Sequence, residues 1–143
     1  MSSYLNIYLQ KKKKEGEEKG ERLLLCSISR VNEIYSIFYD HGLGSQREED
    51  GMHEFTSNDI SSVIDDIERS ISSWLYKILH IKETLPLITE KDTLADMIEE
   101  LESDKEYLQE LMELRATLST LSIIFSDVNE EWCAFDKLYW KTD

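Results

Sequence analysis

Two long rows of apolar residues, each with the spacing of one face of an α-helix, extend over residues 60–78 and 94–125 of the 143-residue chain. The first row is Ile60, Val63, Ile64, Ile67, Ile71, Trp74, Leu75 and Ile78, and the second is Leu94, Met97, Ile98, Leu101, Leu108, Leu111, Met112, Leu118, Leu121 and Phe125. Pro86, the only proline, lies between them and cannot continue a helix. The pattern predicts an antiparallel helical hairpin over 56–127, with Thr89 and Asp92 capping its second helix.

The first 29 residues predict a β-hairpin. From Tyr4 to Gln10, apolar and polar side chains alternate as in a half-buried strand, and residues 23–29 form a second candidate strand. The charged tract 11–21 between them contains Gly16 and Gly20, which suits a loop. Because an isolated hairpin is only marginally stable in water, we expect its strands to pack on helices or to pair with another sheet edge.

Three further segments complete the predicted domain. Apolar residues at helical spacing predict a short helix over 30–42, with Ser29 as its N-cap, and the aperiodic stretch 43–55 predicts a loop. Near-helical spacing of four aromatic residues predicts a short C-terminal docking helix over 128–143; they are Trp132, Phe135, Tyr139 and Trp140. The chain is therefore expected to be one predominantly helical α+β domain, 1–143.

The composition favours a cytoplasmic protein. Cys26 and Cys133 have no neighbouring cysteine or histidine cluster, so we expect neither a disulfide framework nor a zinc site. The N-terminal residues do not follow the order of a signal peptide, and no apolar run approaches the ~20 residues of a membrane span. Secretion and membrane insertion are both unexpected.

Sequence motifs for catalysis and metal binding are missing. The chain has no nucleophile elbow, no phosphate-binding or dinucleotide-binding glycine loop and no HExxH. None of the three histidines, His41, His53 and His80, follows a glutamate by three residues as di-iron bundles require. We therefore expect a non-catalytic protein without metal or cofactor.

The negative charge of the chain is concentrated in its middle. The net charge is −14, and residues 45–113 carry nineteen acidic and six basic side chains. Ten carboxylates fall within 90–113, which at ~1.5 Å per helical residue gives one per ~3.6 Å of axis. A DNA strand carries one phosphate per ~3.4 Å. The residues we assign to a partner-binding acidic face are Asp92, Asp96, Glu99, Glu102, Glu106, Glu110 and Glu113.

This charge pattern predicts a protein-binding module. Its partner would be a basic protein, in the sharpest form a nucleic-acid-binding enzyme inhibited by charge mimicry, as expected of a phage or mobile-element accessory protein. Direct binding to nucleic acid or membranes is disfavoured by the same charge. Two alternatives stay open: an assembly protein, such as a homodimer, formed through the hairpin edge and helical faces, and an enzyme without a recognisable motif. A solvated helix face would also explain the carboxylates.

Overall fold

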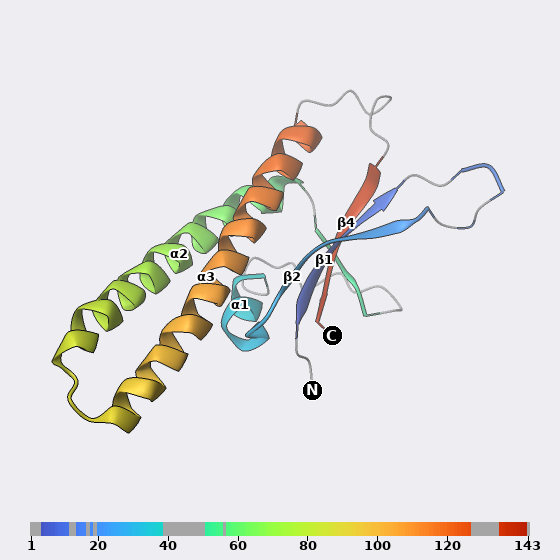
Figure 1. Cartoon of the computed structure of the whole chain (residues 1–143). Helices are drawn as coiled ribbons and strands as arrows, with labels where there is room; N and C mark the ends of the chain where they lie inside the picture. Colours follow the sequence, from blue (N-terminus) through green and yellow to red (C-terminus); the bar gives the residue numbers. More distant parts are fainter. Residues whose placement is uncertain are drawn as a thin grey trace.

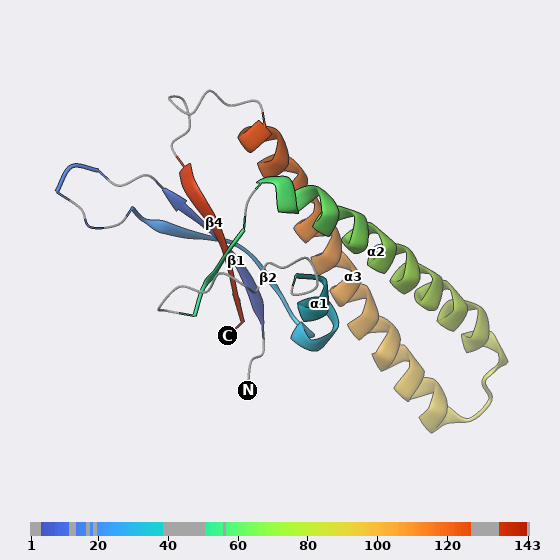
Figure 2. The same cartoon turned by 180° about the vertical axis from the view of Figure 1, so that it is seen from behind.

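The computed structural model describes residues 4–11, 14–16, 18, 20–38, 51–55, 57–126 and 135–142. In chain order the elements are β1 (Leu5–Lys11), β2 (Arg22–Ile28), α1 (Val31–Phe38), β3 (His53–Phe55), α2 (Ser57–Thr84), a 3₁₀ turn η2 (Leu85–Leu87), α3 (Lys91–Ser126) and β4 (Phe135–Thr142). The helices lie together on one side of the sheet, and the α2–α3 hairpin projects well beyond it (Figure 1). Seen from behind, the arrangement is the same (Figure 2). The α+β class with dominant helix is confirmed.

The sheet has four strands in the order β2-β1-β4-β3. Strands β1 and β2 form the predicted antiparallel hairpin, with a bulge because the register steps from Cys26 to Leu24 and skips Leu25. On its other side β1 pairs antiparallel with β4, from Leu5 opposite Thr142 to Lys11 opposite Phe135. The strands were expected to pack on helices or to pair with another sheet edge, and they do both within the same chain.

The predicted C-terminal helix is wrong, because residues 135–142 form strand β4. The near-helical spacing of the aromatic residues was a misleading signal. Both faces of β4 are covered, so its sequence does not show the alternation of apolar and polar residues that marks a half-buried strand. Leu138 and Trp140 face the helices and are buried, while Tyr139 lies on the opposite face, 3% exposed, with Arg22 5.1 Å above its ring. Trp132 lies outside the described residues.

Other boundaries need smaller corrections. Residues 53–55, predicted as loop, form strand β3, which pairs antiparallel with β4. The rest of the predicted loop from residue 43 to 50 lies outside the described residues, as does residue 56 at the expected start of α2. Helix α3 begins after Glu90 rather than Thr89: the Glu90 carbonyl accepts the Leu94 N–H at 3.0 Å, and the Glu90 carboxylate accepts the Thr93 hydroxyl at 2.9 Å.

The main core lies between the sheet and the near half of the helical hairpin. It contains the alternate residues Leu5, Ile7 and Leu9 of β1, with buried side chains from α1, α2, α3, β2 and β4. A second, smaller cluster holds the far half of the hairpin together through Ile78 and Ile81 of α2 and Leu101 of α3. The two long helices are therefore fixed along their whole length, as their apolar rows predict. No helix within the described ranges is long and apolar enough to cross a membrane.

Candidate functional site

The acidic face of α3 is the feature on which the sequence-based hypothesis depends. At 3.6 residues per turn its seven residues fall within about one third of the helix circumference, away from the apolar residues between Leu94 and Met112. Six of them are exposed: Asp92, Asp96, Glu99, Glu102, Glu106 and Glu113. Among the residues that the structure describes, none of these six carboxylates takes part in an ion pair.

The seventh member, Glu110, has a structural role. Its Oε2 accepts the backbone N–H of Ser29 at 3.0 Å and the Ser29 hydroxyl at 2.7 Å. Ser29 is not the predicted cap of α1, because the helix begins at Val31 and Arg30 is the residue that flanks it; the Ser29 hydroxyl instead donates to Glu110 and ties the end of β2 to α3. Glu110 keeps part of its surface in solvent, but its removal would leave a partly buried N–H without its acceptor.

One further carboxylate of α3, that of Asp104, belongs to a partly buried polar cluster that we call the Arg30 cluster: Arg30, Trp74, Lys77, Asp104 and Tyr107. Asp104, 1% exposed, binds Arg30 Nη1 at 3.0 Å through Oδ1 and lies 3.1 Å from Lys77 Nζ through Oδ2. The guanidinium lies 5.1 Å from the ring centres of both Trp74 and Tyr107, which meet edge to face. Outside the cluster, Glu100 also pairs with Lys77, at 3.2 Å.

The Arg30 cluster fixes the junction between β2 and α1 against both long helices. Arg30 has φ = 52°, a conformation that non-glycine residues rarely adopt and that the surrounding contacts must hold in place. Burial alone would lower the pKa of Lys77, but its hydrogen bonds and charge interactions with Asp104 and Glu100 outweigh this, and the pKa is raised. The acidic face is thus presented on a helix held at its middle by ion pairs of Asp104 with Arg30 and Lys77.

The exposed charge on α3 is sparser than the sequence count indicates. Asp104 and Glu100 are paired with cations and Glu110 is hydrogen-bonded to Ser29, which leaves seven of the ten carboxylates facing solvent without a partner elsewhere in the fold: the six of the acidic face and Glu90, whose carboxylate accepts the hydroxyl of nearby Thr93. Over the same 24 residues this is one charge per ~5 Å of axis, compared with ~3.4 Å in a DNA strand. The exposed carboxylates are therefore more widely spaced than the phosphates of a DNA strand.

A shallow hollow of about 270 Å³ lies on this side of α3, lined by Glu106, Gln109, Glu110 and Glu113. It adjoins β2, because Glu110 reaches Ser29 and because burial, together with the charges of Glu113 and Glu110, raises the pKa of the Cys26 thiol to about 12. Three carboxylates around one hollow can attract a cationic side chain.

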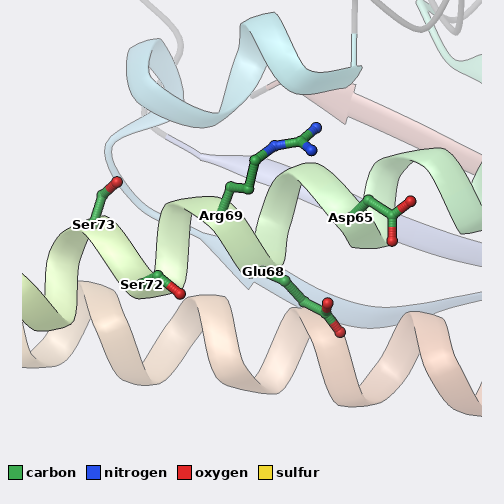
Figure 3. Close-up of a pocket in the computed structure, with 5 residues that line it drawn as sticks. All are labelled: Asp65, Glu68, Arg69, Ser72 and Ser73. Carbon is green, nitrogen blue, oxygen red and sulfur yellow. The ribbon is translucent and has the colours of Figure 1, made fainter.

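A second hollow, of about 560 Å³, lies on α2 between Asp65, Glu68, Arg69, Ser72 and Ser73. Figure 3 shows all five side chains projecting from this one helix. Glu68 is already paired with Arg115 of α3, at 2.9 Å, and Arg69 with Asp66. The serines have no histidine beside them in this lining, so the arrangement offers hydrogen bonds but no activated nucleophile.

The histidines within the described residues lie on other elements than the acidic face. His80 is exposed on α2, and His53 stacks on Trp140 with ring centres 4.3 Å apart. Cys26 is a free thiol on β2. The described part of the chain contains no group of three His, Cys, Asp or Glu side chains placed to hold a metal ion. His41 and Cys133 lie outside the described residues.

The sequence analysis did not identify the Arg30 cluster. One signal was present: Asp104 lies between Leu101 and Leu108 on the apolar side of α3, where a carboxylate must find a cation. Its partner Arg30 is more than seventy positions earlier, and only folding brings the two together.

The fold and these sites were compared with known proteins. No protein-family model, no curated protein and no solved structure matches the chain.

Proposed function

We propose that the protein is a non-catalytic binding module that engages a basic protein through the acidic face of α3. The observation that carries the proposal is that six carboxylates on one face of a single helix are exposed and have no ion-pair partner within the described residues. Residues 57–126 hold fifteen acidic and six basic side chains, so the projecting hairpin has a net charge of −9. A field of this sign concentrates cationic partners and speeds their association.

The sharper form of the proposal makes the partner a nucleic-acid-binding enzyme whose basic groove accepts the α2–α3 hairpin. A groove built for an extended polyanion fits an elongated acidic helix, and the projection of the hairpin beyond the sheet leaves α3 room to enter it (Figure 1). Binding would then exclude nucleic acid by occupying the same cations. We place this interaction in the cytoplasm, in keeping with a free thiol at Cys26.

The experiment compares affinity capture from a host-cell lysate by three proteins. One is wild type, one carries E99Q, E102Q, E106Q and E113Q, and a control carries four neutralised carboxylates elsewhere: E15Q, E18Q, D65N and E83Q. Both variants change the net charge by the same amount, and all eight residues are exposed. Glu110 is left intact because it holds Ser29.

We expect wild type and control to recover the same basic protein and the α3 variant to lose it. Affinity for the purified partner should fall steeply between about 50 and 200 mM salt, as with phosphate contacts. For the sharper form, the protein should displace a labelled oligonucleotide from the partner. Equal capture by all three proteins, or affinity independent of salt, would contradict the proposal.

A further inference from the structure

Strand β2 offers an outer edge on which another strand can add. It is the terminal strand of the sheet, and within the described residues only β1 pairs with it. Proteins usually protect such edges with charged side chains, prolines or short strands. β2 is seven residues long, contains no proline and has one charged residue, Arg22, at its start. Within β2 itself, Arg22 and the bulge at Leu25 are the features that oppose pairing, and Leu24 is 56% exposed.

The charges beside this edge are those of α3. Ser29, which directly follows β2, is hydrogen-bonded to Glu110, and Glu113 and Glu110 both act on the Cys26 thiol. The hollow that Glu106, Gln109, Glu110 and Glu113 line therefore lies next to the C-terminal part of β2. A strand added here would have one face toward these carboxylates and the other toward the side on which Leu24 is exposed.

The spacing of these groups defines the chemistry of the occupant. Alternate residues of a strand are ~6.6 Å apart, while Glu106, Glu110 and Glu113 follow one another at ~6 and ~4.5 Å along the helix axis. Lysine or arginine at alternate positions can therefore meet successive carboxylates, and apolar residues between them would contact Leu24. A second copy of this chain is a poor occupant, because its own β2 would bring a second set of carboxylates against the first.

We propose that β2 takes up an extended segment of the basic partner as a fifth strand of the sheet, with alternate basic side chains directed at Glu106, Glu110 and Glu113. This inference rests on the proposed function and specifies how the partner is recognised. Backbone hydrogen bonds to β2 supply affinity, and the carboxylates of α3 select for alternating positive charge.

The test uses a fluorescein-labelled seven-residue peptide in which lysine and valine alternate, measured by fluorescence anisotropy at 100 mM salt. Two derivatives carry backbone N-methyl groups, one on every lysine and the other on every valine. In a strand, the N–H groups of alternate residues point to the same neighbour. One set of N–H groups therefore faces β2 and the other faces away, while the charge is identical in all three peptides.

We expect one N-methylated peptide to bind at least tenfold more weakly than the parent and the other to bind within threefold of it. The variant E106Q/E113Q should weaken binding of the parent about tenfold, and D92N/D96N, with the same change of charge at the far end of the acidic face, by less than threefold. On binding, hydrogen exchange should slow at the amides of β2 and stay unchanged in β3.

Three results would overturn the inference. If both N-methylated peptides bind like the parent, recognition depends on charge alone; the proposed function then stands and strand addition fails. If the parent does not bind while the lysate partner is still captured, the partner uses another surface. If the protein forms a concentration-dependent dimer that Leu24→Lys dissociates, the β2 edge belongs to a second copy. Failure of the proposed function is detected separately: the variant that carries E99Q, E102Q, E106Q and E113Q would then capture the partner as well as wild type does.

Discussion

Replacing Asp104 with asparagine keeps the shape of the side chain but removes the charge on which the Arg30 cluster depends. Breaking a buried ion pair by removing one partner costs about 3–5 kcal/mol. The Arg30 and Lys77 side chains are 24% and 43% exposed, so water can recover part of that loss. We therefore expect D104N to lower the free energy of unfolding by about 3 kcal/mol, the lower end of the range.

The matched control is Glu100→Gln, which removes the other carboxylate of Lys77. Glu100 is half exposed, and exposed pairs contribute ~0–1 kcal/mol. Urea unfolding followed by tryptophan fluorescence measures both variants, since Trp74 lies within the cluster. With a slope of about 2 kcal/mol per molar urea, D104N should lower the midpoint by ~1.5 M and E100Q by less than ~0.5 M.

A double-mutant cycle with Arg30→Ala completes the test. Because Arg30 and Asp104 satisfy each other, the two substitutions together should destabilise the protein by at least about 1 kcal/mol less than the sum of the single effects. The reasoning is refuted if D104N unfolds within ~0.5 kcal/mol of wild type, or if E100Q is as damaging as D104N.

Four further predictions concern other contacts of the fold. Glu110→Ala should cost about 1–2 kcal/mol in urea unfolding and Glu110→Gln less than half of that, because glutamine keeps an acceptor for Ser29; equal effects would contradict the assigned hydrogen bonds. At pH 8 the Cys26 thiol should react with iodoacetamide about 100-fold more slowly than free cysteine, followed by mass spectrometry of its peptide, and Glu113→Gln should speed the reaction. The pKa of this thiol rises from 9.0 in the unfolded chain to about 12 on folding, so its contribution to the free energy of unfolding is complete below pH 9 and is lost between pH 9 and 12. Cys26→Ala should therefore make the free energy of unfolding fall less over this pH range. Trp140→Ala should cost about 3–5 kcal/mol, since the ring is fully buried in a central strand, and a loss below ~1 kcal/mol would argue against β4.

Local patterns predicted the elements whose contacts are periodic along the chain. The rows on α2 and α3 have one buried side each, and Leu5, Ile7 and Leu9 alternate with polar residues, so both periods are visible in the sequence. In β4 the consecutive residues Leu138, Tyr139 and Trp140 are all buried, so no alternation shows. Strand β3 has only three residues, too few to establish a period.

The site could be predicted only in part for a similar reason. Exposed carboxylates on a long helix follow from its periodicity, and six of the seven assigned residues are exposed; their binding of a partner stays a prediction. The functions of Glu110 and Asp104 depend on Ser29 and Arg30, which precede them by 81 and 74 positions. Contacts over such separations are set by topology, which a single sequence does not display.

The central position of β4 also has a consequence for how the chain folds. The helical hairpin is built from neighbouring segments, so its contacts close short loops and can form early. The β1–β4 ladder joins residues as far apart as Leu5 and Thr142, and its closure costs more entropy. Until β4 arrives, β1 has one open edge and an apolar face awaiting Leu138 and Trp140. Folding should therefore be limited by closure of the sheet, and the species most exposed to aggregation is one in which the helices are formed and the sheet is still two strands wide.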